Sequence, residues 1–125
     1  MSSLPDVILR RAAIEVGGEL AGRRADVASV VAALLAEGLM IFGGEIWWLR
    51  PDGTWTADVP DASGVEGCWT WDVKRESGET GPAFAQRAAE TALDLVAKWP
   101  DPESLPPGLS GEPLYNLEWG TADGA

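Results

Sequence analysis

The sequence predicts an α+β fold with two N-terminal helices, a small antiparallel sheet of about three strands, one amphipathic helix packed on it, and a proline-rich C-terminal tail. Apolar residues recur at helical spacing in the first 36 residues and again over 82–99. Five of the seven tryptophans fall in strand-like segments between 47 and 71, and five of the nine prolines lie between 100 and 113. A chain of 125 residues fits one domain, so we expect residues 1–125 to form a single α+β domain with 100–125 as an extended tail.

The first half of the chain is predicted to begin with two helices. Ser3 can cap the first helix, since Pro5 suits a first helical turn, and apolar side chains then follow at helical spacing over 9–20. The second helix is predicted to begin at Asp26 and to end at Glu37-Gly38. It is apolar nearly all round, so we expect it to be the most buried helix.

A hairpin and a third strand are predicted to form the sheet, with Gly43-Gly44 as a bulge near its start. Proline, aspartate and glycine stand in Pro51-Asp52-Gly53 in the order that a type I turn with a glycine bulge favours. Such a turn would pair Leu49 with Trp55. The third strand is predicted over 67–75. An amphipathic helix capped by Thr80 should follow over 82–99 and cover one face of this sheet.

Side-chain alternation divides the predicted sheet into two faces. The core face, on which the last helix packs, is predicted to comprise Trp47, Leu49, Trp55, Ala57, Trp69, Trp71 and Val73. The opposite face is predicted to comprise Ile46, Trp48, Arg50, Thr56, Asp58, Thr70 and Asp72. A tryptophan with a polar, acidic rim is typical of an interface, so we predict that this second face binds a partner through Trp48. The alternative is that the second helix covers this face and Trp48 belongs to the core.

The net charge of −11 is concentrated after residue 50, where the balance is −10. Because phosphate binding needs clustered lysine and arginine, this charge argues against nucleic acid and anionic membranes as partners and favours a protein with a basic surface. A solvated acidic surface is the alternative. A winged helix over 7–59 would need the arginines at 10, 11, 23 and 24 to meet DNA, which the overall acidity disfavours. Further acidic candidates for partner binding are Asp61, Glu66, Asp101, Glu103, Glu112 and Glu118.

The absence of histidine and the single cysteine exclude most catalytic constellations within this chain. Ser-His-Asp and Cys-His sites, histidine-based metal sites and cysteine-rich zinc sites are all impossible, and no phosphate- or dinucleotide-binding glycine loop is present. A carboxylate pair from Asp58, Asp61, Glu66 and Asp72 could act on a sugar, but solubility is the simpler role for these side chains. The 58–66 segment fails the spacing of a calcium loop. We therefore predict no catalytic residue, metal or cofactor, and we expect Cys68 to pack as a small apolar residue.

The single cysteine allows no internal disulfide, the N-terminus does not read as a signal peptide, and the longest apolar run, Val27–Ala36, is too short to span a bilayer. We expect a cytoplasmic protein, and the excess of arginine over lysine favours a bacterial or phage source. Immunity proteins that neutralise toxins, and phage inhibitors of host defences, are often of this size and charge. The sequence thus favours a small acidic non-enzymatic protein that binds and inhibits another protein. The alternative is a small-ligand-binding domain with a tryptophan-lined pocket.

Overall fold

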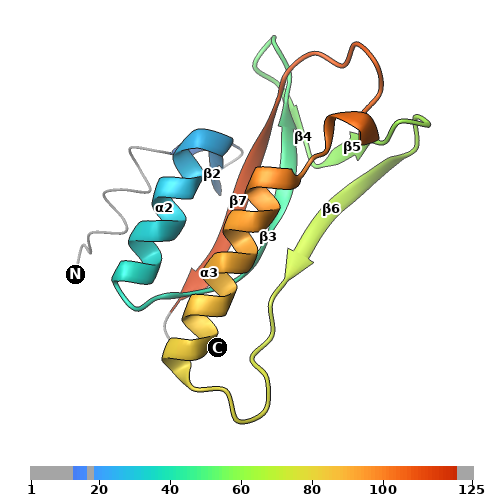
Figure 1. Ribbon diagram of the computed structural model, residues 1–125. Helices are drawn as coiled ribbons and strands as arrows, with labels where there is room; N and C mark the ends of the chain where they lie inside the picture. Colours follow the sequence, from blue (N-terminus) through green and yellow to red (C-terminus); the bar gives the residue numbers. More distant parts are fainter. Residues whose placement is uncertain (1–12, 17–18, 121–125) are drawn as a thin grey trace.

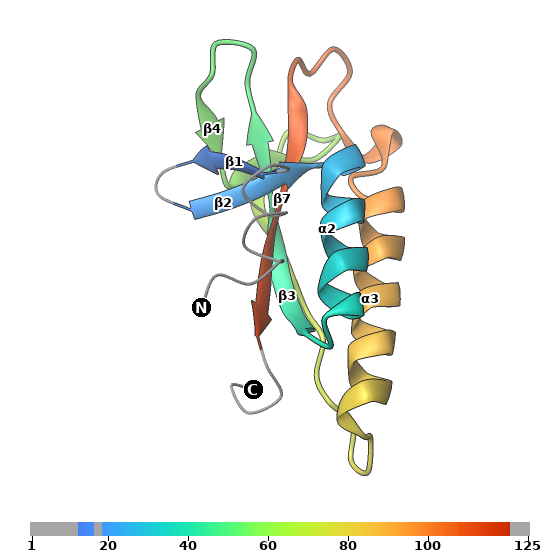
Figure 2. The ribbon, with the colours of Figure 1, turned by 90° about the vertical axis from the view of Figure 1, so that its left-hand side faces the viewer.

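Two helices lie side by side on one face of an antiparallel sheet (Figures 1 and 2) in the computed structural model, which describes residues 13–16 and 19–120. The strands are β1 (Ala13–Val16), β2 (Glu19–Arg23), β3 (Met40–Leu49), β4 (Trp55–Thr56), β5 (Asp58–Pro60), β6 (Glu66–Asp72) and β7 (Glu112–Gly120). The helices are α2 (Arg24–Ala36) and α3 (Gly81–Lys98), and a short 3-10 helix, η1, spans Pro102–Ser104. The strand order is β1-β2-β7-β3-β6-β5, and β4 pairs with the end of β3.

The predicted fold class is α+β, as observed, but two of its details are wrong. The helices are not both N-terminal, since α3 follows β6, and the sheet is larger than three strands. In place of the end of the first predicted helix, β1 and β2 form a hairpin in which Val16 pairs with Glu19. The predicted start of that helix lies outside the described residues. The apolar residues of this segment suit a strand as well as a helix, and the pairing of β2 with β7 decides between them.

The predicted extended tail is also wrong, because residues 112–120 form β7, which lies between β2 and β3. Its pairing with β3 runs from Glu112 opposite Leu49 to Gly120 opposite Met40. Proline has no backbone N–H to donate to a neighbouring strand. Pro113 is tolerated in this central strand because β2 pairs only with Leu114 and Tyr115, so no hydrogen bond to β2 is lost at residue 113.

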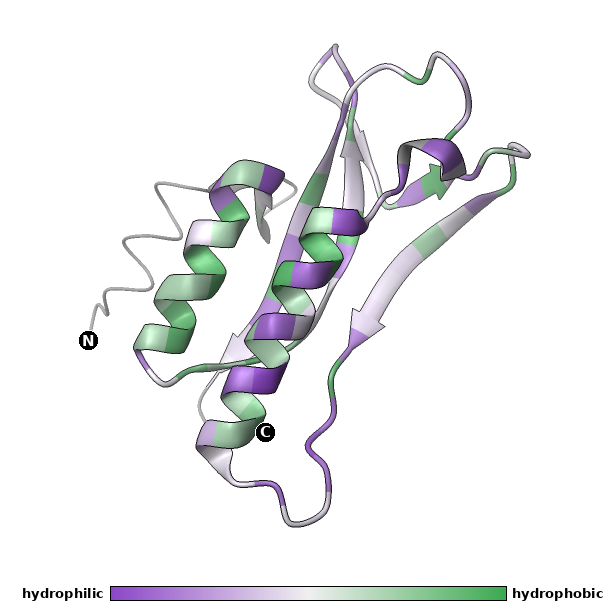
Figure 3. Ribbon diagram, in the orientation of Figure 1, coloured by the Kyte–Doolittle hydropathy of each residue, from purple (hydrophilic) through white to green (hydrophobic). Residues whose placement is uncertain are grey.

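The second and third predicted helices are observed as α2 and α3, but the predicted start of the second is wrong, because α2 begins at Arg24 and Asp26 lies within its first turn. Helix α2 ends at Ala36 with Glu37 as its C-cap, and Gly38 follows with a φ of 72°, a left-handed conformation that glycine adopts without strain. In α3 the Thr80 hydroxyl accepts a hydrogen bond of 3.2 Å from the Ala83 N–H. Figure 3 shows that α2 is apolar nearly all round, whereas α3 alternates apolar and hydrophilic positions. The exposed positions of α2 are largely small residues. The helix is therefore apolar in sequence even on the side that it exposes to solvent.

The main core lies between the helices and the sheet. Fully buried members include Val31 and Leu34 from α2, Phe84 and Ala88 from α3, and Ile41 from β3. A second, smaller core forms on the opposite face of the sheet, where Ala21, Trp47 and Leu114 are buried against Leu49 and Ala57. The predicted pairing of Leu49 with Trp55 is confirmed, and the rings of Trp47 and Trp55 lie 5.0 Å apart. The sheet therefore buries apolar side chains on both faces at the end that carries β4.

The predicted bulge at Gly43-Gly44 is confirmed by a register shift between Ile41 and Gly43. At this point β3 lies between β6 and β7, and the three backbones approach closely. A Cβ atom on Gly44 would lie 2.0 Å from the carbonyl oxygen of Asn116, and one on Gly43 would lie 2.3 Å from that of Trp71. Glycine is thus required here by the close approach of two neighbouring strands.

Candidate functional site

Five of the predicted partner-binding residues line one groove, which we call the hairpin groove. It has a volume of 510 Å³ and lies between the β3–β4 turn, β5 and the loop that precedes β7. Its lining residues are Trp48, Arg50, Pro51, Asp52, Thr56, Asp58, Pro60, Gly64, Glu66, Leu109 and Ser110. The groove has an apolar floor and an acidic rim, and Arg50 is the one basic residue that lines it.

Two tight turns hold the rim of this groove. In the first, the Arg50 N–H donates to the Thr54 carbonyl oxygen over 2.7 Å, and the carboxylate of Asp52 accepts hydrogen bonds from the Thr54 hydroxyl and N–H at 2.6 and 2.9 Å. In the second, the carboxylate of Asp61 accepts in the same way from the Ser63 hydroxyl and N–H at 2.7 and 2.9 Å. These hydroxyl groups are the first cause of the lowered pKa of both aspartates. Both carboxylates are thus charged and are engaged within their own turns.

The predicted anchor, Trp48, is buried on the floor of the hairpin groove. Its side chain is 5% exposed, and its Nε1–H donates to the Ser110 carbonyl oxygen over 2.9 Å. The loop can approach this closely because residue 111 is glycine: a Cβ atom there would lie 2.7 Å from Nε1 of Trp48. Ile46 is buried too, between α2 and α3, in contact with Val27 and Val96. Neither side chain forms an exposed anchor of the kind we predicted.

The predicted grouping of the hairpin with the third strand is wrong, because the helices cover the Ile46 side of β3 and not the Trp47 side. In the register of β3 with β6, Ile46 lies opposite Trp69, and Glu45 lies opposite Thr70. Trp69 and Trp71 therefore share the helix-covered face with Ile46, whereas Thr70 and Asp72 lie on the other face. Because side chains alternate with a period of two, a shift of one residue in the register moves a whole strand to the opposite face. The hairpin turn fixes the register of β4 on β3, whereas the turn at Asp61 fixes β6 against β5 and not against β3.

A second groove, which we call the tryptophan groove, lies where β6 meets the C-terminal end of α3. It has a volume of 310 Å³ and is lined by Ile46, Cys68, Trp69, Thr70, Trp71, Leu95 and Trp99. The rings of Trp69 and Trp99 meet edge to face at 5.6 Å, and Trp99 remains 47% exposed. The sequence allows a tryptophan-lined pocket as an alternative, but its pattern assigns Trp69 and Trp71 to the core and so does not locate this groove. The signal was Trp99, an aromatic residue at the very end of a helix and beside a proline.

Acidic side chains gather on the face of β6 opposite the helices. Here Glu45 accepts a hydrogen bond of 2.7 Å from the Trp47 Nε1–H, and the Cys68 thiol lies 4.0 Å from the same carboxylate. The expectation that Cys68 packs as a small apolar residue is wrong, because this residue is exposed. Partial desolvation, and then the charges of Glu45 and Asp58, raise the pKa of its thiol. A thiol held neutral is a poor nucleophile. Asp72 is exposed on this face and lies 3.9 Å from Lys74, an exposed pair of little strength.

The basic residues of the described chain are engaged by its own groups. Arg23 pairs with Glu112 at 2.7 Å. Arg24 donates to the carbonyl oxygens of Val96 at 2.7 Å and Trp99 at 2.9 Å, and the Tyr115 hydroxyl also hydrogen-bonds to the Trp99 carbonyl. Arg24 thus satisfies carbonyl groups at the C-terminal end of α3, which have no partner within the helix. The two arginines are not arranged as a DNA-binding surface, and those at 10 and 11 lie outside the described residues.

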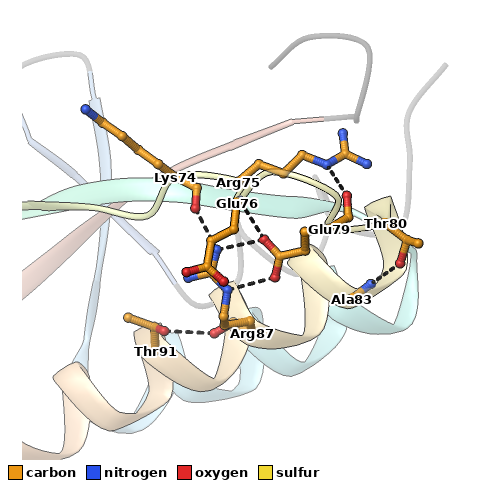
Figure 4. Close-up of polar contacts among 8 residues, drawn as sticks. All are labelled: Lys74, Arg75, Glu76, Glu79, Thr80, Ala83, Arg87 and Thr91. Carbon is orange, nitrogen blue, oxygen red and sulfur yellow. Dashed lines mark hydrogen bonds and ion pairs between the residues drawn. The ribbon is translucent and has the colours of Figure 1, made fainter.

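A salt bridge fixes the connection from β6 to α3 (Figure 4). Arg87 binds both carboxylate oxygens of Glu79 at 2.8 Å and donates to the Lys74 carbonyl oxygen at 2.6 Å. The Glu76 N–H donates to the same carboxylate at 2.9 Å. The hydrogen bonds from Arg87 are the largest cause that lowers the pKa of Glu79 to about 2. This cluster holds the end of β6 in place on α3.

Asp101, Glu103, Glu112 and Glu118, the remaining acidic candidates, line neither groove. The carboxylate of Asp101 accepts a hydrogen bond of 3.0 Å from the Glu103 N–H at the start of η1. Within residues 13–16 and 19–120, no group of three or more cysteine and acidic side chains is arranged to hold a metal ion. None of the helices in this part of the chain has the length and apolar character needed to cross a membrane. A comparison of the chain with protein-family models, with curated proteins and with solved structures found no match.

Proposed function

We propose that this protein is a small acidic, non-enzymatic protein that binds a partner with a basic surface and inhibits it, in the manner of a toxin-neutralising immunity protein or a phage anti-defence inhibitor. The observation that carries the proposal is the distribution of charge at the β5–β6 end of the sheet. Asp58 and Glu66 are exposed there beside the buried Trp48 and the half-buried Pro60, and Asp72 is exposed at the other end of β6. Such a surface offers steering charge and contact area together.

The engagement of the basic residues supports the same proposal. Each lysine and arginine of the described residues contacts another group of the chain, as Arg87 does with Glu79 and Lys98 does with Asp94. By contrast, the carboxylates of Asp58 and Glu66 form no ion pair within the described part of the chain. The acidic surface is therefore not neutralised internally, and its field is open to a basic partner.

The experiment is a capture from native lysate with the immobilised protein, followed by mass spectrometry and by binding kinetics with the partner that it identifies. We expect a partner with a basic surface. The double variant Asp58→Asn with Asp72→Asn should lower the association rate by about tenfold at low salt, and the loss should shrink as salt rises, since exposed charges act through a screened field.

Glu90→Gln is the matched control, because it removes a carboxylate from the exposed side of α3, away from the proposed surface. It should change the association rate by less than about twofold. The proposal is wrong if the captured partner is acidic, or if the Glu90 variant and the double variant slow association equally.

The tryptophan groove favours a second function, the binding of a small apolar or aromatic ligand. Trp69, Trp71 and Trp99 converge on it, and aromatic rings line small-molecule sites more than other surfaces. Native mass spectrometry of the protein purified from its own cells distinguishes the two. A bound small molecule that Trp99→Ala releases would favour the second function, and a bound protein would favour the first.

A further inference from the structure

The second half of β6 has a strand neighbour on one side only. On its inner side β3 pairs with Trp69–Asp72, whereas on its outer side β5 pairs only with residues 66–68. Among residues 13–16 and 19–120, no strand lies beside the outer edge of Trp69–Asp72 (Figure 1). The reason is the course of the chain before β5, which pairs with β3 as β4 and so leaves this edge uncovered.

The backbone groups of this edge point outward in a regular order. The Val73 N–H donates to the Phe42 carbonyl oxygen over 2.8 Å, so residue 73 faces β3. Because successive residues of a strand direct their backbone groups to opposite sides, Trp71 faces β3 as well. Thr70 and Asp72 then present their N–H and C=O groups to the uncovered side. Two donors and two acceptors at strand spacing form a template for one more strand.

Different side chains lie on the two sides of this edge. Toward the helices lies the tryptophan groove, with Trp99 47% exposed at its border. On the opposite side lie Thr70 and Asp72, with Glu45 opposite Thr70 in the sheet and Asp58 opposite Cys68. A strand added here would direct alternate side chains to these two environments. One row would meet aromatic rings, and the other row would meet carboxylates.

We propose that the Trp69–Asp72 edge of β6 is a strand-addition site, at which an extended segment of a protein partner pairs with Thr70 and Asp72. The segment places apolar side chains in the tryptophan groove and lysine or arginine beside the carboxylates. This inference deepens the proposed function and rests on it. Charge decides the occupant: a second copy of this chain would bring its own Asp72 and Glu45 to the same place, and each copy carries a net charge of −11.

The test uses the whole protein and a synthetic heptapeptide with alternating lysine and valine. Two control peptides have the same composition in two blocks, or glutamate in place of lysine. Binding is measured by titration calorimetry, and amide hydrogen exchange is followed by NMR. The alternating peptide should bind best and should slow exchange at Thr70 and Asp72. An alternating peptide that binds no better than the block peptide, or that slows exchange elsewhere, overturns the proposal.

Thr70→Pro removes the central N–H of the edge without touching the ladder to β3, and Thr70→Ala is the matched control that keeps it. The proline variant should bind about tenfold more weakly, as expected for the loss of one or two backbone hydrogen bonds, and the alanine variant should bind within about twofold of the parent. If the proline variant does not fold, a peptide N-methylated at alternate residues tests the same hydrogen bonds, because methylation removes the N–H donors of the peptide instead of those of the protein. Equal binding by methylated and unmethylated peptides contradicts strand addition.

Two further outcomes separate this inference from the function on which it rests. If the captured partner binds Thr70→Pro and Thr70→Ala equally well, the edge is wrong and the inhibitor function stands. If the alternating peptide binds at the edge while the lysate yields no partner, the edge stands and the inhibitor function fails. Protection of the Thr70 amide in the free protein that disappears on dilution would assign the edge to a second copy and would overturn the proposed occupant.

Discussion

Replacement of Gly44 by alanine should destabilise the protein severely, because the backbone of β7 leaves no room for a Cβ atom at this position of β3. The added Cβ would lie 2.0 Å from the Asn116 carbonyl oxygen, whereas an ordinary contact begins at 3.4 Å. Both atoms belong to strands fixed on either side, so no flexible side chain can move away. The two strands must separate by about an ångström, which breaks the hydrogen bonds between Glu45 and Asn116.

The expected loss follows from two contributions. Overpacking in a rigid interior costs roughly 1–3 kcal/mol. Two weakened backbone hydrogen bonds add roughly 0.5–1.5 kcal/mol each. Alanine regains up to about 1 kcal/mol because it restricts the unfolded chain more than glycine does. The net loss in the free energy of unfolding is therefore about 3 kcal/mol, a large fraction of the roughly 5–15 kcal/mol typical of a small domain.

Urea unfolding followed by tryptophan fluorescence and circular dichroism measures this loss. Gly67→Ala is the matched control, since Gly67 lies in β6 with an ordinary φ and a Cβ atom added there would meet no other residue within 4 Å. That variant should gain about 0.4–1 kcal/mol, for the same unfolded-state reason. A Gly44 variant within about 1 kcal/mol of the parent would refute the close approach of β3 and β7.

Two more predictions concern the polar contacts that hold α3. Arg24→Ala should lower the free energy of unfolding by about 2 kcal/mol, because it leaves the Val96 and Trp99 carbonyl oxygens without a charged donor. Its neighbour Arg23 forms only an exposed ion pair with Glu112, so Arg23→Ala should change stability by less than about 0.5 kcal/mol in the same urea titration, and equal losses would contradict the role of Arg24. Glu79→Gln should lower stability at neutral pH, since the pKa of Glu79 is depressed from 4.5 to about 2 in the folded state. The stabilisation is complete above pH 4.5 and is lost as the pH falls toward 2, so the stabilities of parent and variant should converge over that interval; a constant difference across it would show that the carboxylate charge is not responsible.

Much of the fold follows from local signals, and the errors lie where partners far apart in sequence decide. The cap of α3, the glycine after α2 and the Pro51-Asp52-Gly53 turn act through neighbouring atoms, and each of these elements is observed. β7 was missed because its proline and its neighbours indicate an irregular tail. Its alternation of Tyr115, Leu117 and Trp119 with polar residues was the signal for a strand.

The candidate site was predicted only in part, for the same physical reason. The hairpin turn fixes which residues of β3 and β4 share a face, and Trp48 does lie opposite Thr56 on the side of the hairpin groove. The turn that joins β5 to β6 is equally tight, but it sets the register of β6 on β5 and leaves the register of β6 on β3 open. The side on which Thr70 and Asp72 lie therefore depends on how Trp69 packs against α3, which no local pattern specifies.

The position of β7 in the middle of the sheet has a consequence for how this chain folds. Leu114 pairs with Arg23 on one side and with Trp47 on the other, so the middle of the sheet joins residues separated by about ninety and about seventy positions. The helices and the β3–β4 hairpin can form early from nearby residues, but β2 and β3 meet across the sheet only when β7 arrives between them. Such dependence on distant contacts slows folding, because a long loop must close before any stabilisation is gained. Until then Trp47 lacks the partner that buries it, and two strand edges stay open to other molecules.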